Sequence, residues 1–135
     1  MRTDTTKIKI NEKKRNIVVI GDSFDMIDII EIFLYKKYNV IATIDEFDGM
    51  KKIGLFEPIC IFIKAATDNL SSVLMFMSKL VNEKNIPVIA FTKEEISTIN
   101  EFKLKSSGIR EIIKFPINRR DFLEVMQPNI ILSKN

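Results

Sequence analysis

Residues that could take part in chemistry stand directly after short apolar runs of the sequence. Gly21 and Asp22 follow one such run, Lys64 ends a second, and Thr92 ends a third. A carboxylate can bind a divalent cation, and a lysine amine can act as a nucleophile when its pKa is lowered. A lysine at the end of a buried strand is therefore either an active group or a sign that another chemistry has been removed.

The composition narrows this chemistry further. The chain contains no histidine and a single cysteine, Cys60, which lies inside an apolar run and is expected to be a small core residue. Zinc sites of the usual kind, Ser-His and Cys-His nucleophiles and an internal disulfide are excluded. With 46% hydrophobic and 29% charged residues, the 135-residue chain is typical of one globular domain.

Five apolar runs alternate with five segments of helical periodicity. The predicted strands are 16–20, 38–44, 59–63, 86–92 and 109–115, and the predicted helices are 24–37, 45–56, 69–84, 93–108 and 118–127. Such alternation predicts a parallel sheet covered by helices on both faces. We expect an α/β fold of the flavodoxin-like (βα)5 type, a three-layer sandwich whose five-stranded parallel sheet has the order 2-1-3-4-5.

We predict a basic flexible tail over 1–15, a domain over 16–127 and a C-terminal tail over 128–135, since Pro128 should end or kink the last helix. Residues 1–15 hold six basic and two acidic residues, which gives +4 and leaves −1 of the net charge of +3 for the other 120 residues. The basic arm could touch an acidic partner or simply be solvated. No patch mixes aromatic and basic residues, so nucleic-acid binding is not favoured.

The apolar runs are too short to span a bilayer, and the first residues show no apolar block of the signal-peptide kind. We therefore expect a cytoplasmic protein without membrane association.

Parallel strands bring their carboxyl ends to one edge of the sheet, where ligands bind in this fold class. This convergence predicts that the ammonium of Lys64 pairs with Asp22. Two alternatives remain open: Lys64 could extend into solvent, or act as a catalytic amine. No set of convergent polar groups supports the latter, so we expect no enzyme activity.

Residues 16–127 resemble the receiver domain of bacterial two-component response regulators. The resemblance is carried by "IVVIGDS", "PICIFIK", "IPVIAFT" and "SSGIREIIKFPI", in that order and at matching separations. It implies phosphoryl transfer from a histidine kinase to an aspartate that ends the third strand, with Mg²⁺ held by an acidic pair after the first strand.

The acidic positions of the family are mostly replaced in this sequence. Gly21 stands at the first position of the acidic pair, Asp22 at the second, and Lys64 at the phospho-acceptor position. A protonated amine repels Mg²⁺, so we expect metal binding to be lost or weak, with no cofactor and with Asp22 as the single candidate metal ligand left. Lys64 would then act as an internal counter-ion in place of Mg²⁺.

The switch positions are also altered. Thr92 keeps the hydroxyl at the end of the fourth strand, while Ile112 stands at the aromatic switch position. Phe115 replaces the lysine before Pro116, and Lys114, one residue earlier, should point to the opposite face of the strand.

The resemblance therefore favours a degenerate pseudo-receiver that acts in signal transduction by protein–protein interaction without phosphorylation. Its partner would be a signalling protein, or a second copy through the face of the fourth helix, fifth strand and fifth helix. That face offers Ile96, Glu101, Lys105, Arg119, Arg120 and Glu124. Two other hypotheses remain: a phosphorelay receiver modified at Asp68 or Ser71, and a flavodoxin-like binder of a small ligand.

Overall fold

The computed structural model describes residues 10–80 and 84–133. Its elements are β1 (Arg15–Ile20), α1 (Phe24–Leu34), β2 (Tyr38–Thr43), α2 (Glu46–Phe56), β3 (Cys60–Lys64), the short 3₁₀ helix η2 (Thr67–Asn69), α3 (Leu70–Lys79), β4 (Val88–Thr92), α4 (Thr98–Ser106), β5 (Ile109–Lys114) and α5 (Arg119–Ser133).

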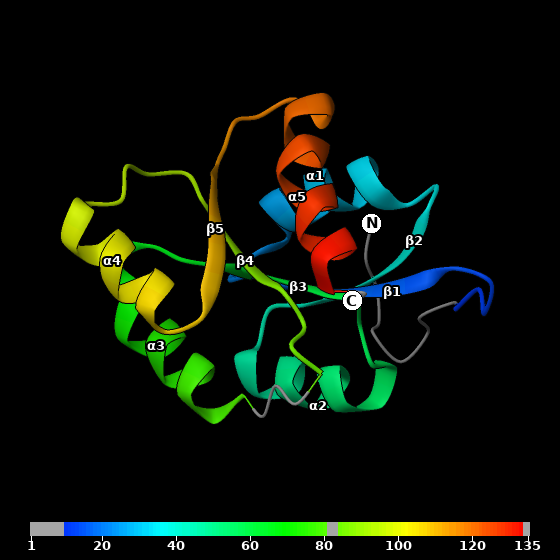
Figure 1. Cartoon of the computed structure of the whole chain (residues 1–135), viewed down its shortest axis with the longest axis horizontal. Helices are drawn as coiled ribbons and strands as arrows, with labels where there is room; N and C mark the ends of the chain where they lie inside the picture. Colours follow the sequence, from blue (N-terminus) through cyan, green and yellow to red (C-terminus); the bar gives the residue numbers. More distant parts are fainter. Residues whose placement is uncertain (1–9, 81–83, 134–135) are drawn as a thin grey trace.

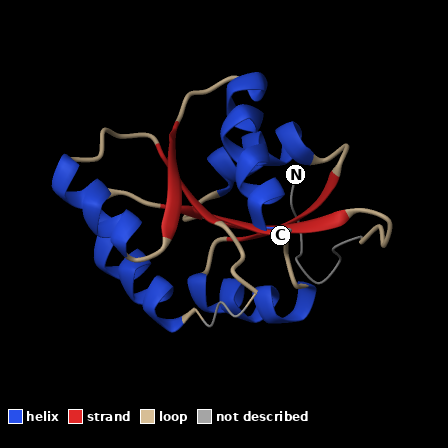
Figure 2. Ribbon diagram, viewed as in Figure 1, coloured by secondary structure: helices blue, strands red, loops and turns tan. Residues whose placement is uncertain are grey.

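The five strands form one parallel sheet in the order β2-β1-β3-β4-β5, which confirms the predicted fold class and strand order. Figures 1 and 2 show the sheet between two layers of helices, with α1 and α5 on one face and α2 and α3 on the other. Within the described residues, no helix has the length and apolar character needed to cross a membrane.

Alternate residues of each strand supply two separate cores, because successive side chains of a strand point to opposite faces. Ile17, Val19 and Phe62 pack with the helices α1 and α5 on one face. Val18 and Ile63 pack with α2, α3 and α4 on the other. This burial on both faces explains why the strands are continuous apolar runs rather than alternating ones.

A β-bulge interrupts the alternation in β5. Val88 pairs with Ile109, but the next residue of β4, Ile89, pairs with Glu111, so Arg110 is an extra residue. Ile109 consequently belongs to the α2–α4 side, whereas Ile113 belongs to the α1–α5 side. The bulge therefore determines which residues at the end of β5 point into the aromatic core.

The start of the fourth helix was predicted at 93 but lies at Thr98. Two observations explain the difference. The Thr92 hydroxyl accepts a hydrogen bond from the backbone N–H of Glu94, which forms a turn after the strand. The Ser97 hydroxyl accepts from the N–H of Asn100 and caps the helix five residues later than predicted. Segment 93–97 is thus a loop at the carboxyl end of β4.

The predicted end of the last helix at Pro128 is wrong, because α5 continues to Ser133 with Pro128 inside it. Proline removes one helical hydrogen bond. The Asn129 side-chain amide donates to the Val125 carbonyl at 2.9 Å, and Ile130 is buried in the α1–α5 core. These contacts offset the cost of the proline, so most of segment 128–135 belongs to the helix rather than to a tail.

The other boundary differences are small. Helix α1 ends at Leu34 instead of 37, and α3 ends at Lys79 instead of 84. Residues 81–83 of the predicted third helix lie outside the described residues. Strand β4 begins at Val88 rather than at 86.

The predicted tail over 1–15 is only partly described, since residues 1–9 lie outside the described residues. Its last residues are bonded to the domain. Buried Asn39 accepts from the Asn11 N–H at 3.0 Å and donates to the Asn11 carbonyl at 2.8 Å. Lys14 donates to the Tyr35 carbonyl at the end of α1, and Arg15 opens β1. The domain therefore begins before residue 16.

Candidate functional site

The carboxyl ends of β1 and β3 place three of the predicted site residues side by side. Ile20 pairs with Ile63, so Gly21 and Asp22 lie beside Lys64. The ladder continues past the strands, because Gly21 donates its N–H to the Thr43 carbonyl at 3.0 Å. The predicted convergence of strand ends is found in the structure.

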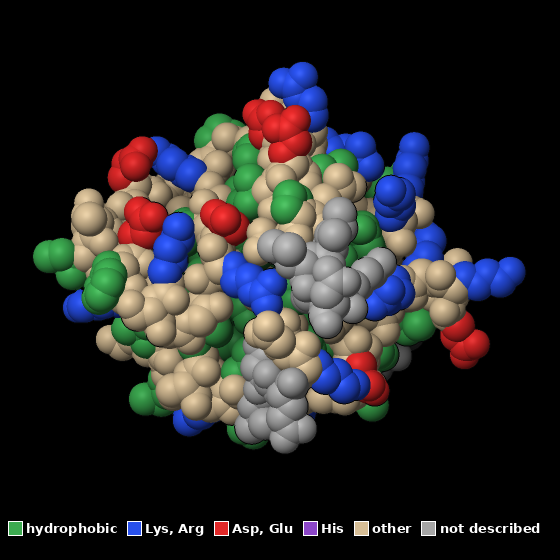
Figure 3. Space-filling view, viewed as in Figure 1, with side chains coloured by type: hydrophobic (Ala, Val, Ile, Leu, Met, Phe, Trp, Pro, Cys, Tyr) green, Lys and Arg blue, Asp and Glu red, His purple; other side chains and the backbone are tan. Residues whose placement is uncertain are grey.

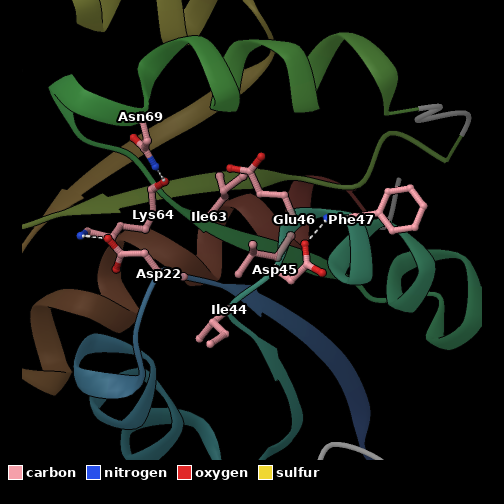
Figure 4. Close-up of a pocket in the computed structure, with 10 residues that line it drawn as sticks. Asp22, Ile44, Asp45, Glu46, Phe47, Ile63, Lys64 and Asn69 are labelled. Atoms are coloured by element: carbon pink, nitrogen blue, oxygen red, sulfur yellow. Dashed lines mark hydrogen bonds and ion pairs between the residues drawn. The ribbon is translucent and has the colours of Figure 1, made fainter.

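The predicted ion pair is present. Lys64 Nζ lies 2.6 Å from Asp22 Oδ2, with the two side chains 20% and 61% exposed. Figure 4 shows the lysine side chain lying along the end of β3 toward Asp22. The half-exposed carboxylate limits the stabilisation to about 1 kcal/mol, which is typical of pairs near water. The pair also requires a protonated amine, so the geometry does not favour a catalytic lysine.

Gly21 leaves little room for a second carboxylate. A Cβ added there would lie 2.9 Å from Ile27 Cδ1 and 3.2 Å from the Ser23 carbonyl, and Ile27 is completely buried. An aspartate at this position would require the end of the Ile27 side chain to move. The surroundings of residue 21 therefore favour a residue without a Cβ.

The residues present do not fit a Mg²⁺ ion. A hard divalent cation needs several oxygen ligands, and Asp22 already binds the Lys64 ammonium. Across residues 10–80 and 84–133, no three acidic, cysteine or histidine side chains are grouped so that they could hold a metal.

The loop after β3 is held by Asn69, which sequence reasoning missed. Its side-chain amide donates to the Lys64 carbonyl at 3.0 Å, and its Oδ1 accepts from the Ala66 N–H at 2.6 Å. These two bonds close a short ring around the end of the strand and fix the backbone that carries Lys64. An asparagine five residues after a strand-end lysine is too common a pattern to signal this role.

Glu94 joins the loops that follow β3 and β4. Its Oε1 accepts from both the N–H and the hydroxyl of Thr67 at 2.6 Å. These bonds, the hydroxyl one foremost, lower the pKa of the Glu94 carboxyl, with a smaller contribution from the positive charge of Lys64. The sequence placed Glu94 in a helix and gave no sign of this bridge.

The switch positions lie outside the ion pair. Thr92 is buried, and its hydroxyl is engaged by the turn to Glu94. Ile112 is half-buried and packs on the α2–α4 core, while Pro116 is exposed. Lys114 points away from Phe115, as predicted, and forms an ion pair with Glu95.

Phe115 is a core residue. It is 3% exposed, and its ring lies 6.1 Å from Phe91 and 6.4 Å from Phe122 in edge-on contacts. Position 115, before Pro116, is therefore occupied by a packed core side chain rather than by a charged one.

A pocket of about 540 Å³ adjoins the ion pair, between the ends of β1, β2 and β3 (Figure 4). It is lined by Ile20, Gly21, Asp22, Ile44, Asp45, Glu46, Phe47, Ile63, Lys64 and Asn69. Its volume lies in the range of small-ligand sites. Asp45 caps α2, accepting from the Phe47 N–H at 3.0 Å.

The sequence matches no protein-family model and no curated protein. Solved structures do resemble the chain in fold. One is the chemotaxis protein CheY4 of Vibrio cholerae, at a TM-score of 0.73 and 17% identity, covering 86% of this chain and 98% of that one. The fold is that of CheY-like receiver domains.

Two other solved structures extend this comparison. The receiver domain of the sensor histidine kinase PA1611 from Pseudomonas aeruginosa has a TM-score of 0.69 and 17% identity, covers 87% of this chain and 98% of that one, and holds magnesium in its active-site cleft. NtrX of Brucella abortus, in complex with ADP, has a TM-score of 0.74 and 16% identity over 90% of this chain. This chain spans only 27% of NtrX.

Within the receiver fold, the structure brings Gly21, Asp22 and Lys64 together. Ile112 and Phe115 pack in the two cores, and Pro116 is exposed. The pocket lined by 44–47 was not predicted, because the sequence pattern does not show which side chains lie around these residues.

Proposed function

We propose that this chain is a receiver-like domain of two-component signalling that acts through protein–protein interaction without being phosphorylated. The observation that carries the proposal is the 2.6 Å contact between Lys64 Nζ and Asp22 Oδ2. A positive charge occupies the place where a receiver domain of the family would hold a metal and accept a phosphoryl group. Lys64 acts as the internal counter-ion of Asp22.

Two further features support the loss of the phosphoryl switch. The room at Gly21 does not accept a second carboxylate without moving Ile27. The Thr92 hydroxyl is bonded within its own turn, and Phe115 fills a core position instead of offering an ammonium. Restoring the family's chemistry would therefore need several coordinated changes.

The exposed surface of α4 supports an interaction role. Ile99 and Phe102 are 67% and 71% exposed and lie three residues apart on one side of the helix. Figure 3 shows hydrophobic side chains together with charged ones over α4 at the left of the view. Exposed apolar groups among charges are typical of association surfaces.

We propose that the α4–β5–α5 face binds a signalling protein or a second copy of the chain. The expected charges on this face are partly engaged within the domain. Lys105 pairs with Glu101 at 3.5 Å, and Arg119 donates to the Phe33 carbonyl at 3.1 Å. The apolar pair on α4 therefore contributes more to this surface than those charges.

The phosphorylation part is tested with acetyl phosphate and Mg²⁺, followed by intact mass and peptide mapping, and with beryllofluoride followed by the amide NMR spectrum. A receiver domain with a complete acidic site is the positive control. We expect neither mass nor spectrum to change for this chain. A phosphoryl group mapped to Asp68 or Ser71, both exposed in the loop and helix after β3, would instead support the unorthodox relay.

The interaction part is tested by analytical ultracentrifugation of the parent chain and of Phe102→Glu. Leu55→Glu on α2 is a matched control, because Leu55 is 74% exposed and lies on a different helix. We expect self-association that only Phe102→Glu weakens. A chain that is monomeric at all concentrations, or a dimer that tolerates Phe102→Glu, would rule out the homodimer.

A further inference from the structure

The pocket beside the ion pair combines an apolar floor with an apolar rim. Ile20 and Ile63 form the floor and are almost completely buried. Ile44 and Phe47 stand at the rim and are 50% and 71% exposed. Figure 4 shows these two side chains on the β2–α2 side of the pocket, away from Lys64. A ligand that extends past the pocket would cover apolar surface that now faces water.

The charges that line the pocket are unbalanced. The pocket is lined by three carboxylates, from Asp22, Asp45 and Glu46, and by one ammonium, from Lys64. Asp22 uses Oδ2 for Lys64, Asp45 uses Oδ1 for the Phe47 N–H, and Glu46 uses Oε1 for the Ser72 hydroxyl at 2.6 Å.

The second oxygen of each carboxylate, in the described part of the chain, has no hydrogen-bond partner. The amino end of α2, which would otherwise attract an anion, is capped by Asp45 and followed by a further acidic residue, Glu46. The pocket therefore favours a cation.

The ring of Phe47 already attracts a cation on one side. Lys51 Nζ lies 4.9 Å from the ring centroid, within the range of cation–π contacts. The ring is nevertheless mostly exposed, and it lines the pocket. A flat cation could stack against the exposed ring while it hydrogen-bonds the free carboxylate oxygens.

We propose that this pocket binds an arginine side chain from a segment of a partner protein, with aliphatic neighbours of that arginine covering Ile44 and Phe47. The planar guanidinium bonds carboxylates through two N–H groups at once and stacks on aromatic rings, which an ammonium does less well. The aliphatic stem of the partner's arginine side chain would pack on Ile20 and Ile63 at the floor of the pocket. The inference rests on the proposed function, because the pocket must be free of Mg²⁺ and phosphoryl groups.

The test is a titration of the ¹⁵N-labelled chain with acetyl-Leu-Arg-Leu-amide, followed by amide shifts. We expect millimolar binding with shifts at Gly21, at 44–47 and at Lys64. The same peptide with citrulline in place of arginine keeps the shape and removes the charge, and it should bind at least tenfold more weakly. Equal binding of the two peptides, or shifts elsewhere on the surface, would overturn the inference.

Two variants test the carboxylates without removing the cap. Asparagine caps helices as well as aspartate, and glutamine can still accept from Ser72, so Asp45→Asn and Glu46→Gln should keep their folds. Together they should weaken peptide binding about tenfold. Glu12→Gln removes an exposed carboxylate just before β1, at the opposite edge of the sheet, and should leave binding unchanged.

Two further measurements distinguish a failure of the arginine proposal from a failure of the proposed function. Spermidine that binds as well as the peptide would show a site for any polycation and would overturn the arginine proposal. Labelling by acetyl phosphate with Mg²⁺, measured in parallel, would overturn the proposed function itself. Without labelling and without peptide binding, only the present inference would fail.

Discussion

The coupling between Lys64 and Asp22 is the most direct test of the counter-ion role. Coulomb's law in bulk water gives about 1.6 kcal/mol for unit charges separated by the observed 2.6 Å. Ordering the two side chains reduces this gain, and measured pairs near the surface reach at most about 1 kcal/mol. Because Lys64 is only 20% exposed, we expect a value near that upper limit, about 1 kcal/mol.

The assay is a double-mutant cycle with Lys64→Met, Asp22→Asn and the double variant, each unfolded in urea at pH 7. At low ionic strength the coupling free energy should be about 1 kcal/mol. In 1 M NaCl the screening length falls to about 3 Å, so the coupling should fall to about 0.4 kcal/mol.

The pair Lys84–Glu57 is the control, with a similar distance of 2.8 Å but side chains 70% and 63% exposed. Its coupling should be smaller than that of Lys64 and Asp22, because solvent screens both partners. A Lys64–Asp22 coupling no larger than the control, or one that salt does not change, would refute the counter-ion role.

Three other predictions concern the supports of the site. In α2, a Cβ on Gly54 would contact nothing, so Gly54→Ala should raise the unfolding free energy by about 1 kcal/mol and Tm by about 4 °C. A Cβ on Gly49 would lie 2.6 Å from a core side chain, so Gly49→Ala should destabilise the protein by about 1 kcal/mol, although alanine has the better helix propensity. Equal shifts of Tm for Gly49→Ala and Gly54→Ala would contradict this packing. The folded-state pKa of Glu94 is lowered from 4.5, so the stabilisation by its carboxylate is present above that pH and is lost as the pH falls below it. The urea midpoint of Glu94→Gln should therefore lie below that of the parent at pH 7 and approach it at acidic pH. A difference between the two midpoints that does not change with pH would contradict the shift. Phe115→Lys buries a charge in an aromatic cluster and should cost at least about 3 kcal/mol in urea unfolding, against about 1 kcal/mol for Phe115→Leu; comparable losses would contradict the buried position.

The strand order and the site at the strand ends could be predicted because the relevant signals are local and repeated. Each buried strand is a continuous apolar run, and right-handed crossovers leave few topologies for five alternating strands and helices, of which the order 2-1-3-4-5 is a common one. The contact between Lys64 and Asp22 then follows from the pairing of Ile20 with Ile63.

The features that were missed depend on partners distant in sequence. Glu94 has strong helix propensity, but its bonds to Thr67, 27 residues away, help to hold it in a loop together with the turn to Thr92. The bulge at Arg110 has no mark in the sequence, because it depends on the register with β4. Pro128 remains helical because Ile130 is buried in the core. In each case a tertiary contact overrides a local preference.

The aromatic cluster around Phe115 has a consequence for which substitutions the fold can accept. A change at position 64 alters one charge at the end of a strand, but a lysine at 115 would have to displace a ring from between Phe91 and Phe122. The end of β3 can therefore exchange one charge for another at small cost, whereas position 115 is closed to any charged side chain unless the interior is repacked.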